Sequence, residues 1–201
     1  MIAIIDYDAG NTKSVVKAVE HLGYECKLTR EFSDIKNADK LILPGVGSFG
    51  DAMEKLERFE LVDLIKEEVA NGKPILGICL GLQLFFDESD ETPGVKGLGL
   101  IKGKIKRFPE KEGYKIPHMG WNDIDIKDNT RLFKGIENHS YVYFVHSYYL
   151  DSEVREAVAA RTQYTTDFDA AVEYGNIFAC QFHPEKSGNV GLNILKNYCE
   201  V

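Results

Sequence analysis

One cysteine of this chain stands where a thiol could act as a nucleophile. Cys79 is the central residue of Gly77-Ile78-Cys79-Leu80-Gly81, which has the glycine-x-nucleophile-x-glycine spacing of a tight strand-to-helix turn. The two glycines have a steric reason, because such a turn brings them together where a Cβ atom would clash. The helix N-terminus favours the thiolate, and the Leu80 N–H would point toward an oxyanion. A small buried cysteine in a glycine-rich turn would explain this stretch equally well.

A second segment offers the base that a nucleophilic thiol needs. His183 and Glu185 lie in Gln181-Phe182-His183-Pro184-Glu185, directly after an apolar run. In an extended backbone, residues two apart point to the same side, so the carboxylate could orient the imidazole. Pro184 favours that extended backbone at His183. Taken alone, the pair is more simply an exposed His and Glu on a surface loop, and only Cys79 favours interpreting it as a base and its orienter.

The third segment, Pro44-Gly45-Val46-Gly47, directly follows another apolar run. Gly45 and Gly47 allow unusual φ angles and close approach of the backbone to a ligand. Their N–H groups could complete an oxyanion hole with that of Leu80. A plain loop leading into a helix at Ser48 is the alternative.

The remaining candidates for chemistry do not assemble into a site. The other histidines lack the spacing to acidic residues or cysteines that is typical of metal ligands, and the cysteines form no Cys-x-x-Cys pair. The glycine-rich stretches lack the third glycine or the Lys-Ser/Thr of phosphate-binding loops. We therefore expect no metal, no cofactor and three structural cysteines. The residues set aside are His21, His118, His139, His146, Cys26, Cys180 and Cys199.

The three segments must be brought together by the elements that precede them. Short apolar runs alternate with amphipathic stretches in the first half of the chain, which is typical of a parallel sheet covered by helices on both faces. Ligands bind at the carboxyl ends of the strands in such sheets, where all three segments lie. The predicted strands are Ile2–Ile5, Tyr24–Leu28, Lys40–Leu43 and Pro74–Ile78. The predicted helices are one capped by Asn11-Thr12 and stopped by Gly23, then Ser48–Phe59, Leu61–Ala70 and Leu80–Phe86.

After Gly94 the pattern changes to closely spaced strands, which predicts antiparallel hairpins. The predicted strands are Leu98–Phe108, Asn122–Ile126, Tyr141–Leu150, Val154–Thr162 and Ala170–Phe182, the last with a turn at residues 173–176, followed by a helix at Val190–Tyr198. A closed α/β barrel needs roughly 250 residues. We therefore predict one domain, residues 1–201, of the α/β class: an open, doubly wound, mostly parallel sheet with added antiparallel strands.

Composition narrows the classes of function. The 201 residues include 24 Lys and Arg against 32 Asp and Glu, a formal net charge of −8, which argues against binding to a nucleic-acid backbone. No apolar run approaches the roughly 20 residues of a membrane span, and the N-terminal run is too short and too soon acidic for a signal peptide. We expect a cytoplasmic protein with no nucleic-acid or membrane partner.

With the three segments in this order, the chain resembles the class I, or triad-type, glutamine amidotransferases over essentially its whole length. The match also includes Gln83 and Lys186-Ser187, and it implies a flavodoxin-like fold. By this resemblance, Cys79 attacks the side-chain amide of L-glutamine, His183 is the base that later protonates the departing ammonia, and Glu185 orients His183. The implied oxyanion donors are Gly45, Val46, Gly47 and Leu80. The implied substrate-binding residues are Gly47, Gln83, Glu91, His146, Ser147 and Tyr148.

Within the family, the chain is most similar to the glutaminase subunits of histidine biosynthesis. The stretches that carry this likeness are Ile5–Tyr7 with Gly10-Asn11, Pro117–Asn122, Tyr143–Tyr148 and Lys186–Gly188. Asp8-Ala9 departs from this branch, which more often has glycine after the tyrosine. The branch implies a heterodimer with a (β/α)8-barrel cyclase, which uses the ammonia to make imidazole glycerol phosphate and AICAR. The implied interface residues are Pro117, His118, Met119, Trp121, Asn122 and Lys186. Core packing is an equally good explanation for Trp121.

A separate physical argument also points to a second chain. Ammonia is mostly protonated at neutral pH, and ammonium has no lone pair, so an ammonia source must lie against its consumer. The glutaminase domain uses almost the whole chain, and we therefore expect the consumer on another polypeptide. Three alternatives stay open: the glutaminase subunit of another synthase, such as those for anthranilate or pyridoxal phosphate, a catalytically silent binding module, or a cysteine hydrolase that acts alone.

Overall fold

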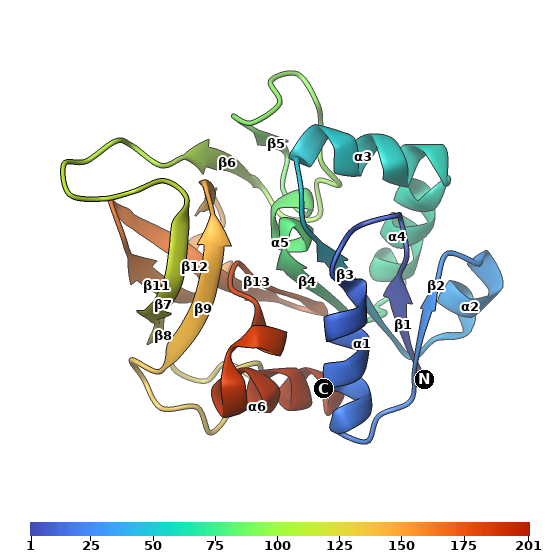
Figure 1. Ribbon diagram of the computed structural model, residues 1–201. Coiled ribbons are helices and arrows are strands. Elements are labelled where there is room, and N and C mark those ends of the chain that lie inside the picture. Colours follow the sequence, from blue (N-terminus) through green and yellow to red (C-terminus); the bar gives the residue numbers. More distant parts are fainter.

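Three neighbouring parallel strands bring the three candidate segments to one edge of the sheet. The structure is a computed structural model that describes residues 1–201 (Figure 1). β3 (Lys40–Gly45) pairs with β4 (Ile75–Cys79), with Gly45 opposite Cys79, and β13 (Ile177–Cys180) lies on the other side of β4. The three segments therefore begin side by side, as expected for the carboxyl ends of parallel strands.

The main sheet is the open mixed sheet that the sequence predicts. Its other strands are β1 (Ile2–Ile5), β2 (Cys26–Thr29), β5 (Glu88–Ser89), β6 (Gly103–Arg107), β8 (Asp125–Ile126), β10 (Tyr148–Ser152), β11 (Val158–Gln163) and β12 (Asp167–Tyr174). The strand order is β2-β1-β3-β4-β13-β12-β10-β6-β5, and β11 pairs with β12 and β8. All neighbours from β2 to β13 are parallel, and the strands added beyond β13 pair antiparallel except for β5 with β6.

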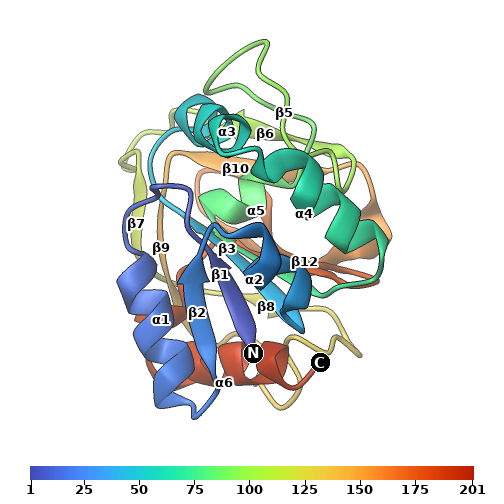
Figure 2. The same cartoon turned by 90° about the vertical axis from the view of Figure 1, so that its right-hand side faces the viewer.

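Helices cover both faces of the parallel strands (Figures 1 and 2). α1 (Thr12–His21) and α6 (Gly188–Cys199) pack on the face to which β1 contributes Ile2 and Ile4. Ala3 and Ile5 point to the opposite face, which is covered by α2 (Phe32–Asn37), α3 (Phe49–Arg58) and α4 (Leu61–Ala70). Alternate side chains of one buried strand thus join two separate apolar clusters, which makes the sheet doubly wound. None of the helices is long and apolar enough to cross a bilayer.

The second half of the chain departs from the prediction at Ser147. The single strand predicted for Tyr141–Leu150 is wrong, because β9 (Tyr141–His146) and β10 enter different sheets. β9 pairs antiparallel with β7 (His118–Asp123) in a separate two-stranded sheet. Buried and exposed residues alternate in β9 and again in β10, as in a half-buried strand. The sequence around Ser147 therefore does not show that the two strands belong to different sheets.

Other boundaries differ for local reasons. β7 begins four residues earlier than the strand predicted from Asn122, because His118 and Gly120 on its buried face hide the alternation. α2 is a short helix without a clear apolar repeat, so the sequence pattern does not predict it. The predicted strand Asn122–Ile126 is divided between β7 and β8, which belong to different sheets, and β5 is not predicted. Among the other differences, α5 (Leu80–Leu84) ends before Phe86, Leu98–Phe108 is a strand only from Gly103, and Val154–Thr162 begins with the 3-10 turn η1 (Arg155–Ala157).

The turn between β4 and α5 leaves no room for side chains at its two glycines. A Cβ on Gly77 would lie 2.8 Å from the carbonyl group of Gly81, and a Cβ on Gly81 would overlap the Leu43 carbonyl oxygen of β3. Between them, Cys79 has a φ of 55° and a ψ of −106°, a conformation that is strained for a residue with a side chain. The close contact of α5 with β3 therefore holds the thiol at the edge of the sheet.

We expect Gly81→Ala to lower the free energy of unfolding by about 3 kcal/mol or more, because α5 cannot withdraw from β3 without disturbing the paired strands. Gly72→Ala is the matched control. It adds the same methyl group at a φ of 91° but into open space, and should cost about 1 kcal/mol. Urea unfolding followed by circular dichroism measures both values. Equal losses in the two variants would contradict this account of the turn.

Candidate active site

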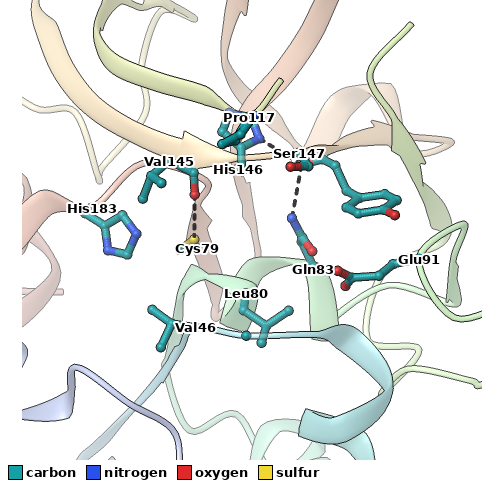
Figure 3. Close-up of a pocket in the computed structure, with 12 residues that line it drawn as sticks. Val46, Cys79, Leu80, Gln83, Glu91, Pro117, Val145, His146, Ser147 and His183 are labelled. Atoms are coloured by element: carbon teal, nitrogen blue, oxygen red, sulfur yellow. Dashed lines mark hydrogen bonds between the residues drawn. The ribbon is translucent and has the colours of Figure 1, made fainter. Parts of the chain in front are cut away.

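A cavity of about 390 Å³ opens at the carboxyl ends of β3 and β4 (Figure 3). Its volume lies within the range of small-molecule sites, roughly 300–1,000 Å³. Every lining residue except Val145 is among those that the sequence singles out. The lining residues are Val46, Gly47, Cys79, Leu80, Gln83, Glu91, Pro117, Val145, His146, Ser147, Tyr148 and His183.

Cys79 presents its thiol to this cavity while most of the residue is buried. Only 6% of Cys79 is exposed. Its Sγ lies 4.0 Å from the carbonyl oxygen of Val145 and 3.7 Å from Nε2 of Gln181, which donates to it. Figure 3 shows the sulfur between the His183 ring on one side and the Gln83 amide on the other. A molecule bound in the cavity would therefore meet the sulfur directly.

Glu185 holds one nitrogen of His183, while the ring lies beside Cys79 (Figure 3). Nδ1 of His183 is 2.8 Å from Oε1 of Glu185, and both side chains are buried. His183 has the expected extended backbone, but Glu185 belongs to the 3-10 turn η2 (Pro184–Lys186). The turn, rather than an extended strand, folds the carboxylate back onto the ring. Nε2 of His183 is buried and has no hydrogen-bond partner.

The neighbours of His183 keep its ring protonated at neutral pH. Burial acts to lower the pKa of this histidine, but the adjacent Cys79 and Glu185 outweigh burial and raise the pKa of His183 to about 9. A cationic imidazole stabilises a thiolate next to it. The site therefore places a proton donor and a nucleophile together.

Asn11 belongs to this site, although the spacing of the sequence motifs gives it no role there. Its Nδ2 donates to Oε1 of Glu185 at 3.1 Å, the same oxygen that contacts His183. The predicted capping of α1 by Asn11 is wrong, because Asn11 has a φ of 67° and its side chain makes no capping bond. Ser14 Oγ donates to Oδ1 of Asn11 at 2.9 Å, which turns the N–H₂ of the amide toward the carboxylate. No sequence signal links residues 11 and 185, and only the fold brings them together.

Ser187 ties the loop that carries His183 to β9. Its Oγ donates to the His183 carbonyl at 2.7 Å and accepts from the Tyr143 N–H at 2.9 Å. The His183 N–H in turn donates to the Tyr143 carbonyl at 2.9 Å. The backbone that carries the imidazole is therefore fixed to the two-stranded sheet.

The loop after β3 offers unpaired backbone donors to the cavity. Val46 and Gly47 line the cavity, and neither of their N–H groups has a hydrogen-bond partner in the protein. A Cβ on Gly45 would meet the hydroxyl of Tyr7. That hydroxyl donates to the Pro44 carbonyl at 2.8 Å and so holds the start of the loop. The loop can therefore present N–H groups to a negatively charged oxygen.

Gln83 and Glu91 form the polar end of the cavity (Figure 3). Nε2 of Gln83 donates to the Tyr148 carbonyl at 3.1 Å and to Oε1 of Gln181 at 3.0 Å. Because a carbonyl only accepts, the amide nitrogen must lie on that side, and the Gln83 oxygen stays free to accept. Glu91 Oε2 accepts from the Phe49 N–H at the start of α3, at 2.7 Å. The two oxygen-bearing side chains suit an ammonium group.

His146 lines the cavity, but its ring has no polar atom left for a ligand. Nδ1 lies 2.8 Å from the Tyr148 carbonyl oxygen, and Nε2 lies 3.0 Å from Nδ1 of His118. The geometry therefore does not support a direct bond from the His146 ring to the substrate. His118 is only 3% exposed. The implied position of His118 at a partner interface is therefore wrong, because its side chain lies on the inner face of β7 and points into the core.

The outer face of the two-stranded sheet is apolar and open to solvent. Met119 is 63% exposed and Trp121 is 55% exposed on β7, and Tyr141 is 59% exposed on β9. Trp121 lies against Tyr143, with ring centroids 6.1 Å apart, so it is a surface residue and the core alternative is excluded. Exposed aromatic and apolar side chains of this kind are typical of protein interaction sites. Of the other implied interface residues, Pro117 and Lys186 are exposed and Asn122 is half-buried.

The arrangement is suited to acyl transfer through a covalent intermediate. A thiol at a strained turn, a cationic histidine held by a carboxylate, and unpaired N–H groups are the three components of such a site. No group of three His, Cys, Asp or Glu side chains is placed to hold a metal ion.

Comparisons with known proteins give one consistent result. The family model for class-I glutamine amidotransferases matches residues 3–200. The chain is 48% identical over 201 residues to imidazole glycerol phosphate synthase subunit HisH of Caldanaerobacter subterraneus subsp. tengcongensis, covering 100% of this chain and 98% of the relative. It is 50% identical over 201 residues to the subunit of the same name in Oceanobacillus iheyensis, covering 100% and 99%. A solved structure described as a crystal structure of glutamine amidotransferase has a TM-score of 0.78 at 19% identity, covering 99% of this chain and 100% of that one, which is a likeness of fold.

We expect Glu185→Gln to lower the pKa of His183 well below about 9, because the amide removes the negative charge while burial, which opposes protonation, remains. Titration of the histidine ring protons by NMR measures this change. Glu67→Gln makes the same substitution on the exposed surface of α4 and should leave the pKa of His183 unchanged. A titration of His183 that is the same in Glu185→Gln as in the wild type would refute the charge pairing.

Proposed function

Because the chain belongs to the class-I glutamine amidotransferase family, we propose that it is the glutaminase subunit of an imidazole glycerol phosphate synthase in histidine biosynthesis. It hydrolyses L-glutamine to L-glutamate and ammonia, in a single domain that spans residues 1–201. The observation that carries this proposal is the convergence of Cys79 and His183, the latter held from behind by Glu185, on one cavity that is also lined by unpaired N–H groups.

The chemistry follows from the charges of these groups. The Cys79 thiolate attacks the side-chain amide carbon, and the Val46, Gly47 and Leu80 N–H groups stabilise the resulting oxyanion. Gly45, the fourth implied donor, does not line the cavity. Protonated His183 gives its proton to the amide nitrogen, so that the C–N bond breaks and ammonia leaves the thioester. Neutral His183 then takes a proton from water, and the hydroxide attacks the thioester. Collapse of this second intermediate releases glutamate and restores the thiolate beside the cationic imidazole.

The polar end of the cavity recognises the amino-acid end of glutamine. The Gln83 amide oxygen accepts from the α-ammonium group, and the Glu91 carboxylate pairs with its charge. Both side chains are held by backbone partners before the substrate arrives, which reduces the entropy lost on binding. The backbones of Gly47, Ser147 and Tyr148 complete the site.

The ammonia passes to a (β/α)8-barrel cyclase that forms a heterodimer with this chain. Ammonia released into water would be protonated and lost as a nucleophile, so the two active sites must be joined by a shielded path. Met119 and Trp121 on the outer face of the two-stranded sheet provide exposed apolar anchors for this partner. Pro117 lies both beside the cavity and on the surface, and Lys186 extends the same interface, whereas the side chain of Asn122 points inward to His118.

We expect Cys79→Ala to reduce glutamine hydrolysis by at least about 1,000-fold, because no other group can form the thioester. The same change should abolish covalent labelling by a chloroketone analogue of glutamine, detected as a mass increase of the intact chain. Cys26→Ala is the matched control, since Cys26 is a half-buried free thiol outside the cavity, and it should retain both activity and labelling. Hydrolysis that survives in Cys79→Ala would refute the mechanism.

We expect the isolated chain to hydrolyse glutamine slowly, and the barrel cyclase from the same source to raise the rate strongly. Met119→Ala with Trp121→Ala should weaken binding of the cyclase about 10-fold or more, measured by calorimetry. Tyr174→Ala removes an exposed aromatic ring from β12, outside this face, and should leave binding unchanged. Rapid turnover without a partner would support a hydrolase that acts alone, and stimulation by the synthase subunit for anthranilate would identify a different branch of the family.

A further inference from the structure

We propose that His118 and His146 are positioning residues for glutamine, and that they form a one-directional chain of hydrogen bonds from Asn122 on β7 to the Tyr148 carbonyl that holds Gln83. This inference rests on the proposed function, because it assigns to Gln83 the recognition of the substrate. In this series of hydrogen bonds, both imidazoles are neutral and both carry their proton on Nδ1. Neither ring touches the substrate.

The four groups lie in hydrogen-bonding sequence. Nδ2 of Asn122 is 3.4 Å from Nε2 of His118, and Nδ1 of His118 is 3.0 Å from Nε2 of His146. Nδ1 of His146 is 2.8 Å from the carbonyl oxygen of Tyr148. Asn122 is anchored in turn, since Nδ2 also donates to the Gln163 carbonyl at 2.8 Å. Each ring nitrogen of the histidine pair therefore has one partner.

The carbonyl at the end of the chain determines the direction of every bond. The Tyr148 oxygen can only accept, so the proton of His146 must be on Nδ1. In a neutral ring, Nε2 of His146 then accepts, and the proton of His118 must also be on Nδ1. Nε2 of His118 is left as an acceptor, and the Asn122 amide is the only donor beside it. Reversing either tautomer would place two donors or two acceptors against each other.

The surroundings of the pair keep both rings neutral. His118 stacks between Phe144 and Tyr164, with ring centroids 4.8 Å and 4.1 Å away, and Phe108 and Phe168 pack beside His146. Neither ring forms an ion pair with a carboxylate. A positive charge on His118 or on His183 opposes protonation of His146. Burial lowers the pKa of His118 to about 4 and that of His146 to about 3.

The series of hydrogen bonds ends at the Tyr148 carbonyl, which also binds Gln83. The Tyr148 oxygen accepts from Nδ1 of His146 and from Nε2 of Gln83, and both bonds converge beside the cavity in Figure 3. Oε1 of Gln181 accepts a hydrogen bond from the second N–H of Gln83, and Nε2 of Gln181 donates to the Cys79 sulfur. Tyr148 follows Ser147, where the chain passes between the two sheets, so this carbonyl has no continuous strand on its N-terminal side to hold it. The histidine pair supplies that support and keeps the Gln83 oxygen directed at the substrate.

The tautomers can be observed without measuring activity. In the full-length chain labelled with ¹⁵N at histidine, long-range ¹⁵N–¹H spectra should show His118 and His146 both as the Nδ1–H tautomer and untitrated between pH 8 and pH 5. The signals are assigned by their loss in His118→Asn and His146→Asn. A proton on Nε2 of either ring, or titration of either ring near its ordinary pKa of about 6.5, would overturn the proposal.

Kinetics of the chain with its partner cyclase separate positioning from packing. His118→Phe keeps an aromatic ring but no donor, and should raise the KM for glutamine about 10-fold with little change in kcat. His118→Asn places an amide N–H near the position of Nδ1, and should restore the KM to within about 2-fold of wild type. Equal KM values for the two variants, or a loss confined to kcat, would overturn the positioning role. His139→Phe, on the exposed loop before β9, serves as a control for a surface change.

Failure of the proposed function can be distinguished from failure of the positioning role. If the wild-type chain with its partner cyclase does not hydrolyse glutamine, the glutaminase assignment fails and the substrate role of Gln83 fails with it. The spectra would still decide whether the Nδ1–H chain exists. Wild-type hydrolysis with the wrong tautomer would overturn this inference alone.

Discussion

The contact of α5 with β3 is the constraint on which the rest of the site depends. Gly81 lies so close to the Leu43 carbonyl that no side chain fits between them, and this closeness places Cys79 opposite Gly45 in the next strand. The thiol and the loop that offers its N–H groups are therefore positioned by one packing contact. The strained φ of Cys79 is maintained because strands buried on both sides of β4 cannot move apart.

The three histidines of this region show how neighbours decide the charge of one residue type. His183, His118 and His146 are all buried, and burial lowers the pKa of each. His183 alone has a carboxylate and a thiol beside it, and its pKa rises to about 9. The other two have no carboxylate partner and pack against aromatic rings and each other, and the charge of His183 further opposes protonation of His146, so both stay neutral. The site thus combines a charged ring, the proposed proton donor, with uncharged rings whose proposed role is directional hydrogen bonding.

β7 serves two purposes because the side chains of a strand alternate between its faces. Met119 and Trp121 point outward to solvent, whereas His118 and Asn122 point inward to the hydrogen-bond chain that reaches Tyr148. β9 beside it is tied to the His183 loop through Ser187. The two-stranded sheet therefore lies between the proposed partner and the proposed catalytic residues, with direct bonds to the backbone of the latter.

The sequence by itself determined the parallel half of the fold and singled out the proposed reacting groups. Local rules suffice for the fold, because a buried parallel strand is a continuous apolar run. A glycine-flanked cysteine at the end of such a strand is explained equally well as a buried structural residue, and only the segments around His183 and Gly45 favoured the nucleophile. The division of Tyr141–Leu150 at Ser147, the inner place of His118 and the partnership of Asn11 with Glu185 were decided only by the tertiary structure. In each case the deciding contact joins residues far apart in the chain, so no local spacing records it. The charge states of the histidines belong to the same class, because they depend on which groups the fold places around each ring.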